Sequence, residues 1–500
     1  MTGRLWNALK NRQDMLGLAR NALLLAMIVR VHFGLGALPE GRLDLYSKCV
    51  DTLLEHWTKA KDLAESPIER SVKHGFLARL AFDMQKDAGT GMGESVELRI
   101  GRPDLSRRLR EFLRTNCPKA IGQVDEIIDR LHQRDAILVA DGSGGFGFVH
   151  RSFQEYFAAC YMAAELSYPE FDALVAEDRQ GWNETLYLAV ARTGHRPRRQ
   201  EIVIGLLKRS KVEFAWEAIR AARGVDPWLE SLAGFLLGFY NSSQRPDARA
   251  CADCCGDHPR TLDILAGLFD RETREGPALA GAVALADLLA ERGDSGAAAL
   301  LEAFSREADG LEVGMVPVAG GRFPYGEKNK SVDVPAFEID RTPVTNEQFS
   351  RMVPGHLRLL PKEFAGPRQP VVVVNLYEAE LFARWRGCRL PTEEEWEKAA
   401  SWDAELGRKR KYPWGDEFDS AKCNTKEAKI GRTTDVGSYP LGRSAVGCDD
   451  MAGNVWEWTQ PGSVRGGSWF SSSDLAACGR RGDCEPYFRN LPIGFRCART

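Results

Sequence analysis

The sequence predicts a multidomain protein, with an all-α N-terminal half followed by a smaller α+β domain. Five hundred residues exceed what a single hydrophobic core organises. Apolar residues recur at helical spacing in the first part of the chain, for example at Leu45, Cys49 and Leu53. After Asp309-Gly310, seven of the twelve tryptophans fall among many glycine and proline turn signals, which is typical of a loop-rich domain with aromatic anchors.

Composition divides the chain into three predicted domains. Residues 1–160 carry the helical apolar pattern, residues 161–310 are rich in alanine and leucine and resemble helical repeats, and residues 311–500 form the α+β domain. Within the second domain, residues 278–304 predict two helices that break at Arg292-Gly293-Asp294. The change of texture at about residue 310 is the sharpest boundary in the sequence.

The charge and composition argue against several classes of partner. The net charge of −3 gives no basic character of the kind that favours nucleic acid or anionic membrane. The apolar run at 16–33 is broken by Arg20, Asn21, Arg30 and His32 and lacks a cleavage site, so it predicts an amphipathic helix. Most of the twelve cysteines are scattered, which favours a reducing cytosol; we therefore expect a cytoplasmic protein.

One cysteine cluster raises the alternative of a zinc site. Cys251, Cys254 and Cys255 are followed by His258. Structural zinc sites take four ligands, usually from two separated pairs. Adjacent cysteines in an alanine-rich helix are more often small buried apolar groups, and we favour that interpretation.

The N-terminal region carries a long motif that ends in an aromatic helix. A glycine-rich turn at 141–147 predicts a short strand and then a helix with Phe153, Tyr156 and Phe157 on one face. The stretch from Phe146 through His150-Arg-Ser152 to Ala159, with Leu18-Ala-Arg-Asn21 and Leu45-Tyr46 before it, resembles the helical and winged-helix end of NACHT-type NTPases. Ala22 departs from the proline usual there. The resemblance implies a winged-helix domain, and a nucleotide-phosphate contact for His150; the alternative is a histidine that closes the strand onto the helix.

The sequence lacks the phosphate-binding loop that would hold a nucleotide next to His150. A P-loop needs Gly-x4-Gly-Lys-Ser/Thr, whose amides and lysine surround the phosphates. The sequence contains no such motif, and the glycine spacing at Gly321 and Gly326 is followed by Glu327. We therefore expect no ATP binding or hydrolysis. We also expect the chain to begin after the nucleotide core, with a NACHT core on another chain as a candidate partner.

The last 185 residues carry an ordered series of motifs. Arg389-Leu390-Pro391-Thr392 followed by Glu395 predicts a helix start with a capping box. The Gly453-Asn454 turn is followed by Trp456 and Trp458, which alternate as in a strand. The series resembles the formylglycine-generating enzyme, or sulfatase-modifying factor, family, which implies a C-type-lectin-like fold. Its motifs are Val316-Pro-Val-Ala-Gly320, Phe337-Glu-Ile-Asp340, Gly387-Cys-Arg389, Tyr412-Pro-Trp414-Gly415-Asp416, Asp450-Met-Ala-Gly453-Asn454, Arg465-Gly-Gly467-Ser468-Trp469 and Gly494-Phe495-Arg496.

Calcium is the cofactor that this resemblance suggests. Asp450 and Glu457 flank the turn, and their carboxylates together with the Gly453 and Val455 carbonyls supply the hard oxygen ligands that calcium prefers. The matching positions of the family bind calcium. Asn424 matches a ligand of the family's second calcium site, although the following segment departs from the pattern. The alternative is a pair of solvated carboxylates.

The catalytic residues of the family are absent from the matching stretch. The family's oxidase chemistry uses two cysteine thiolates that hold copper, a ligand pair suited to a soft metal. Here the first position falls on Ser471 and the second between Ser473 and Ala476, while Cys478 matches a different position. We therefore expect no copper and no formylglycine-forming activity. An oxidoreductase of the same family, acting on a protein or a small molecule, is the alternative function.

The segment 470–492 is the candidate ligand-binding surface. Arg465-Gly-Gly467-Ser468-Trp469 and Ile493-Gly494-Phe495-Arg496 frame it, and 22 of its 23 residues are types that an adenine-randomised asparagine codon encodes, Glu485 being the exception. This resembles the variable proteins of diversity-generating retroelements. The alternative is an ordinary family loop with Arg481, Pro486 and Arg489 in framework roles. The mix of aromatic and polar residues suits adaptable recognition of an unknown protein or small-molecule ligand. We predict these contact residues: Phe470, Ser471, Ser472, Asp474, Arg480, Asp483, Tyr487, Phe488 and Asn490.

Overall fold

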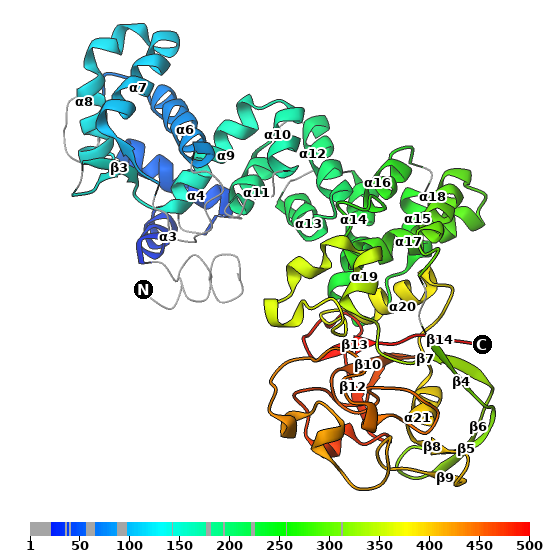
Figure 1. Ribbon diagram of the computed structural model, residues 1–500. Helices are drawn as coiled ribbons and strands as arrows, with labels where there is room; N and C mark the ends of the chain where they lie inside the picture. The colour runs from blue at the N-terminus through cyan, green and yellow to red at the C-terminus, as the bar shows by residue number, and fades with distance from the viewer. Residues whose placement is uncertain are drawn as a thin grey trace. The chain divides into compact units, whose positions relative to one another are not determined.

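The described part of the chain forms two compact units in a computed structural model (Figure 1). One unit contains Met1–Leu206 with Phe214–Val225, and the other contains Leu207–Glu213 with Asp226–Thr500. The described residues are 22–35, 38–39, 42–56, 66–87, 98–142, 144–176, 182–193, 196–221, 226–256, 258–311 and 314–500.

The first unit is mainly helical, with one small sheet. Helices α6 and α11 pack against α9, and the sheet has the strand order β1-β3-β2 with antiparallel pairing. Among the described residues, no helix has both the length and the apolar character needed to cross a bilayer. The helices and strands are α3 (Ala22–Leu35), α4 (Arg42–Asp51), α6 (Arg70–Asp87), β1 (Ile100–Gly101), α7 (Arg102–Asn116), α8 (Val124–Asp129), β2 (Leu138–Ala140), β3 (Gly145–Phe148), α9 (Arg151–Glu165), α10 (Tyr168–Ala176), α11 (Asn183–Arg192), α12 (Arg196–Lys208) and α13 (Val212–Ala221).

The predicted strand-to-helix motif is confirmed. The glycine-rich turn leads into β3, and the aromatic face of α9 is buried through Phe153, Tyr156 and Phe157. His150 stands at the N-cap of α9, where its Nδ1 accepts a hydrogen bond from the Ser152 amide at 3.1 Å. A cap of this kind satisfies a helix-terminal amide, so it is a structural role of the sort that the alternative interpretation predicts. Helix α3 forms the later part of the apolar run, and residues 16–21 lie outside the described residues.

The second unit combines a group of helices with the C-terminal domain. The predicted break at Arg292-Gly293-Asp294 is confirmed, because α17 ends at Glu291, Gly293 has φ of +96°, and the Asp294 side chain caps α18. The compact units thus divide within the predicted 161–310 domain, and the three-domain division stays a prediction. The helices are α14 (Pro227–Asn241), α15 (Ala248–Cys255), α16 (Thr261–Leu268), α17 (Gly276–Glu291), α18 (Ser295–Arg306), α19 (Asn346–Met352), α20 (Leu376–Trp385) and α21 (Glu393–Ser401).

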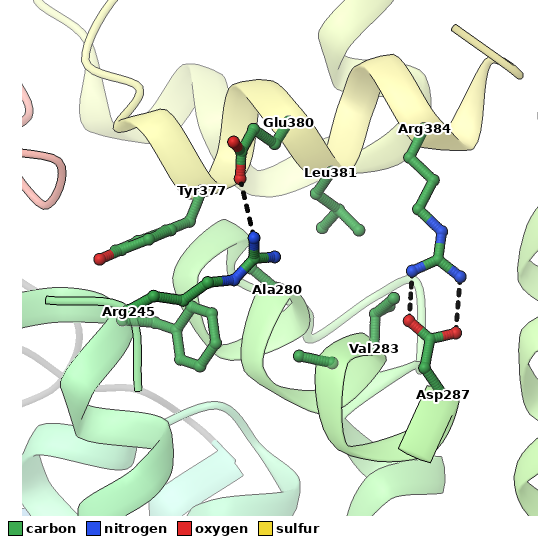
Figure 2. A pocket seen from close by; sticks show the side chains of 10 residues that line it. Arg245, Ala280, Val283, Asp287, Tyr377, Glu380, Leu381 and Arg384 are labelled. Atoms are coloured by element: carbon green, nitrogen blue, oxygen red, sulfur yellow. Dashed lines mark hydrogen bonds and ion pairs between the residues drawn. The ribbon is translucent and has the colours of Figure 1, made fainter. Parts of the chain in front are cut away.

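Hydrogen bonds and ion pairs join these helices to the C-terminal domain. The indole of Trp385 donates to the Phe304 carbonyl at 2.9 Å, and the buried Arg274 donates to the Met352 carbonyl at 3.2 Å. Figure 2 shows the seam between α17 and α20, where Arg384 pairs with Asp287 across a cavity of only about 70 Å³. Because these contacts are buried or bidentate, we infer that residues 226–310 support the C-terminal domain.

The C-terminal domain contains several small sheets joined by long loops. Strand β10 lies inside a four-stranded sheet of order β12-β11-β10-β13, antiparallel to β11 and parallel to β13. A second sheet has the order β14-β7-β4, and β5-β6 and β8-β9 are hairpins. The strands are β4 (Met315–Val318), β5 (Gly321–Tyr325), β6 (Lys330–Val334), β7 (Phe337–Asp340), β8 (Trp402–Asp403), β9 (Arg408–Lys409), β10 (Trp456–Thr459), β11 (Ser463–Arg465), β12 (Arg481–Asp483), β13 (Ile493–Phe495) and β14 (Ala498–Arg499).

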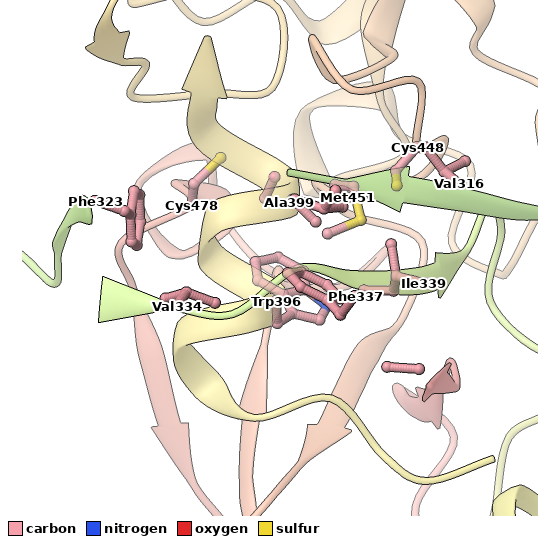
Figure 3. Packing of buried hydrophobic residues seen from close by; sticks show 13 residues of the cluster. Val316, Phe323, Val334, Phe337, Ile339, Trp396, Ala399, Cys448, Met451 and Cys478 are labelled. Carbon is pink, nitrogen blue, oxygen red and sulfur yellow. The ribbon is translucent and has the colours of Figure 1, made fainter. Parts of the chain in front are cut away.

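Helix α21 places the largest side chain in the core of this domain. The predicted capping box is confirmed, because the Thr392 side chain accepts from the Glu395 amide and Glu395 accepts from the Thr392 amide. One turn later Trp396 is fully buried among aliphatic and aromatic residues from β4, β6 and β7 (Figure 3). The fold class predicted from the sequence, a helical half followed by a sheet-containing α+β domain, is therefore confirmed.

The cysteine cluster on α15 has the packing expected of small buried groups. Cys251 and Cys255 are buried with their Sγ atoms 3.3 Å apart, while Cys254 is exposed. The ring of His258 stacks on Trp228 at 3.7 Å between centroids. Within the described ranges, no group of three or more histidine, cysteine or acidic side chains has an arrangement that holds a metal.

Candidate functional site

The candidate site is built on two turns that are joined by backbone hydrogen bonds. Gly453 and Asn454 both have positive φ, and the Asn454 amide donates to the Asn424 carbonyl at 2.7 Å. A Cβ atom on Gly453 would lie 2.3 Å from that carbonyl oxygen, so only glycine fits here. The Gly453 amide donates to the Gly466 carbonyl, and the Trp469 amide donates to the Asn454 carbonyl. These bonds determine where the segment after Trp469 begins.

A serine pair occupies the place where the family's first thiolate was expected. Ser471 is 6% exposed, and its Oγ accepts from the Ser468 amide at 3.1 Å and lies 3.1 Å from the Ser468 hydroxyl. The hydroxyl closes the turn, so Ser471 does not lie on the exposed surface where we expected it. The 3₁₀ helix η9 (Ser473–Ala476) contains the second position; Ala476 is buried and lies about 3 Å from a Cβ placed on Gly467.

Cys478 is part of the core of the domain. It is buried in the same cluster as Trp396, and burial raises the pKa of its thiol well above the ordinary value (Figure 3). A thiol that resists ionisation is a poor nucleophile and a poor metal ligand. Cys478 therefore has a packing role.

The first half of the segment 470–492, residues 470–480, offers exposed side chains at several positions. Phe470 is 67% exposed and contacts the Trp469 ring edge-on at 5.6 Å between centroids. Ser472 and Asp474 are also exposed. The other predicted contact residues with exposed side chains are Arg480, Asp483, Phe488 and Asn490, and Tyr487 is partly buried.

A pocket brings two of the predicted contact residues together with residues that the sequence analysis missed. Asp474 and Arg480 line a pocket of about 350 Å³. The other side is formed by the β5–β6 turn and by residues that follow the β8–β9 hairpin. The missed lining residues are Gly326, Glu327, Asn329, Lys409, Arg410, Lys411, Ala477 and Gly479. The basic run at 408–411 was the sequence signal that could have pointed to them.

The second half of the segment is attached to α20. The Arg489 guanidinium donates to both carboxylate oxygens of Glu378, at 2.9 and 2.7 Å, and Glu378 is fully buried. The Leu376 amide donates to the Pro486 carbonyl at 2.9 Å. Pro486 and Arg489 therefore have the framework roles of the alternative interpretation. Arg481 differs, because its side chain is exposed. It pairs with the nearby Asp483 at 2.5 Å and, at the longer distance of 3.7 Å, with Glu393.

The carboxylates around the Gly453 turn accept hydrogen bonds from other parts of the domain. Both oxygens of Glu457 accept from Arg496, at 2.6 and 2.7 Å, and Oε2 also accepts from the Trp396 indole at 2.7 Å. Asp450 Oδ2 accepts from the Gly437 amide at 2.6 Å, and burial raises the pKa of Asp450 to about 6. Both carboxylates are buried, so the alternative of a solvated pair is wrong.

The second candidate calcium ligand, Asn424, has its side-chain nitrogen but not its side-chain oxygen in hydrogen bonds. The Asn424 side chain donates to the Arg432 carbonyl at 2.9 Å, and its Oδ1 is buried without a hydrogen-bond partner. Gly453 forms an isolated β-bridge with Asn424, and both Gly453 and Val455 are buried. Calcium binding itself stays a prediction, which a calcium titration of the purified chain would test.

Two regions of the chain match known families. Residues 301–500 match the family described as sulfatase-modifying factor enzyme 1-like domain. Residues 42–162 match the winged helix-turn-helix domain C-terminal to NACHT. Both resemblances inferred from the motifs are confirmed.

Several individual proteins are similar over the C-terminal region. The hercynine oxygenase of Mycolicibacterium thermoresistibile is 33% identical, over 35% of this chain and 54% of its own length, so this chain spans about half of that relative. The inactive C-alpha-formylglycine-generating enzyme 2 of Mus musculus is 31% identical, over 37% of this chain and 85% of its own length. Among solved structures, Treponema denticola variable protein 1 is 22% identical with a TM-score of 0.33, covering 38% of this chain and 96% of that chain.

Proposed function

We propose a non-catalytic recognition role, on the premise that the chain belongs to the formylglycine-generating enzyme family through its residues 301–500. In this proposal the C-terminal domain binds a protein or small-molecule ligand through the exposed part of the segment 470–492. Residues 226–310 support that domain, and the winged-helix region is the part that would meet a NACHT core on another chain.

The main support for the proposal is the burial and the hydrogen bonding of the Ser471 hydroxyl. Its hydroxyl is buried and hydrogen-bonded to Ser468, at the position where the family's chemistry uses a copper-binding thiolate. A serine hydroxyl does not replace a soft thiolate ligand. Cys478, the next cysteine along the chain, is packed in the core. The mouse relative, which is named as inactive, supports the same conclusion.

The hercynine oxygenases keep an enzymatic alternative open for testing. They are named as oxygenases, so an oxidoreductase on this fold is the second candidate function. A metal bound by histidines would be one basis for such chemistry. His356 is the only histidine beyond residue 310, and it is buried with its Nε2 donating to the Val372 carbonyl at 2.8 Å. This engagement favours recognition over oxygenation.

Metal analysis of the purified full chain tests the proposal. We expect neither copper nor iron in stoichiometric amount after dialysis, and no oxygen consumption with a cysteine-containing peptide. The variant Ser471→Cys/Ala476→Cys places thiols at the first matching position and at one of the candidate second positions, and it is the comparison variant for copper uptake. One tightly bound copper or iron per natural chain, with oxygen consumption, would overturn the proposal.

A further inference from the structure

Three separate segments of the C-terminal domain form the pocket beside the β5–β6 turn. The turn contributes Gly326, Glu327 and Asn329. The stretch at 409–411 forms a second wall, and the stretch at 474–480 forms a third. A volume of about 350 Å³ is within the range that small-molecule sites occupy.

Two of the four basic side chains in the lining are already neutralised by partners outside it. Lys409 Nζ pairs with the buried Glu397 at 2.5 Å and donates to the Gly326 carbonyl at 2.8 Å. Arg410 is hydrogen-bonded to Asp403 and donates to the Pro413 carbonyl at 3.2 Å. These cations hold the pocket wall together and offer little net charge to a ligand.

Two lining side chains of opposite charge have no ionic partner. Across residues 314–500, all of which the structure describes, Lys411 has no carboxylate within 4.0 Å and Asp474 has no cation within that distance. The Lys411 ammonium lies 5.2 Å from the centre of the Tyr412 ring. The pocket therefore presents one unmatched positive group and one unmatched negative group.

A second pair of opposite charges stands beside them in the lining. Arg480 pairs with Glu327 at 2.6 Å, and these side chains are 48% and 61% exposed. A solvent-exposed ion pair contributes little stability. A ligand that carries both charges can replace this pair without leaving either partner unmatched.

We propose that this pocket binds a zwitterionic small molecule of the α-amino acid or short peptide type. The ligand carboxylate would lie against Lys411 and Arg480, and its ammonium against Asp474 and Glu327. A ligand with one charge alone would leave the opposite side chain facing a like charge or water, which costs affinity. The inference rests on the proposed function and names the chemical class of its ligand.

Titration calorimetry on the full chain, with matched probes, tests the inference. The first probes are the twenty α-amino acids and alanyl-alanine. For each amino acid that binds, the second probes are its N-acetylated form, which keeps the negative charge, and its amide, which keeps the positive charge. Inorganic phosphate is the probe for a simple anion site. We expect at least one zwitterion to bind, and both blocked forms to bind about tenfold more weakly or worse.

Four variants connect the binding to the pocket. Lys411→Met and Asp474→Asn each remove one charge and keep the side-chain volume. Lys422→Met and Asp435→Asn are the controls, since neither side chain lines the pocket and neither lies in the segment 470–492. We expect the first two to lose affinity about tenfold or more and the controls to bind as the natural chain does. Because Lys411 has no ion pair and Asp474 is exposed, all four should keep the natural unfolding midpoint.

Three outcomes would overturn the inference. No binding of any zwitterion would do so, as would equal binding by Lys411→Met or Asp474→Asn and their controls. Phosphate binding equal to that of the best amino acid would replace it with an anion site. None of these outcomes changes the metal content of the chain, so each is distinguishable from failure of the proposed function.

Discussion

The two halves of the segment 470–492 are continuous in sequence, but they differ in what their side chains do for the fold. In the first half, Phe470, Asp474 and Arg480 project from the domain surface or line its pocket. In the second half, Arg489 reaches back to the buried carboxylate of Glu378. One loop thus combines exposed side chains with a side chain that holds the loop to the fold. We expect that the exposed residues of the first half can change without changing the fold, whereas Arg489 cannot.

The second half of the segment 470–492 is also connected, through α20, to helices α14 and α17. Glu378 lies against the start of α17, where a Cβ on Gly276 would be 1.9 Å from its Oε1. One residue before α20, the Asn375 side chain donates to the Phe239 carbonyl of α14 at 3.0 Å. Arg489 is thus joined through α20 to both α14 and α17. The second half of the segment 470–492 is therefore held by the same helix that contacts residues 226–310.

Loss of the anchoring ion pair should have the largest effect on stability. Arg489→Ala leaves the carboxylate of Glu378 buried without its cation, which typically costs about 3 to 5 kcal/mol. Arg481→Ala is the matched control in the same segment, because its side chain is exposed, and it should cost about 0.5 kcal/mol or less. Urea unfolding of the full chain measures both. Equal free energies of unfolding for the two variants would show that the second half is not anchored.

Acid should weaken the anchored half through His356. Burial lowers the pKa of His356 to about 4, and its Nε2 donates to the carbonyl of Val372, next to the Val373 amide that bonds Asn490. The unfolded chain, with a histidine pKa near 6.5, binds more protons between those values, so stability falls as the pH falls from about 6.5 to 4. The histidine contributes about 3 kcal/mol of this loss at most.

The variant His356→Gln isolates this contribution. Glutamine keeps a donor for the Val372 carbonyl but does not titrate in this range, so the difference in unfolding free energy between variant and natural chain should change with pH. Unfolding curves at several pH values from 4 to 7 measure it. Parallel pH profiles would contradict the assignment.

The exposed half should show the smallest effect on stability. Phe470→Ala removes a ring that is 67% exposed, and surface changes of this kind stay within about 0.5 kcal/mol. Trp469→Ala is the contrasting variant, because its ring is partly buried against Phe364 at 5.5 Å between centroids, and it should cost at least about 1 kcal/mol. Thermal unfolding compares the two. A large loss with Phe470→Ala would show that this aromatic belongs to the core.

Local patterns in the sequence predicted local structure well. Thr392 and Glu395 are three residues apart, so their capping box depends only on the backbone between them. The break at Gly293 and the strand at Trp456 were predictable for the same reason, since turn chemistry and alternation act over a few residues. The order of the family motifs then identified the domain that these elements build.

Contacts between distant residues could not be predicted from those patterns. Asp450 and Glu457 flank a turn as calcium ligands would. The side chain that pairs with Glu457, however, is that of Arg496, 39 residues further on. Lys411 lines the pocket just after the β8–β9 hairpin. The pairing of these two strands cannot be inferred from the spacing of residues in the sequence. Ser471 was expected at the surface because it lies in the segment predicted as the ligand-binding face, but its hydroxyl closes an inner turn.

Site saturation of residues 470–490 in the full chain, with selection for folded protein by protease resistance, tests the division of the segment most directly. The account predicts that Phe470, Ser472, Asp474 and Arg480 accept most substitutions, whereas Arg489 and the buried Ala476 and Cys478 accept few. Uniform tolerance across all these positions, or intolerance at the exposed ones together with tolerance at Arg489, would contradict it.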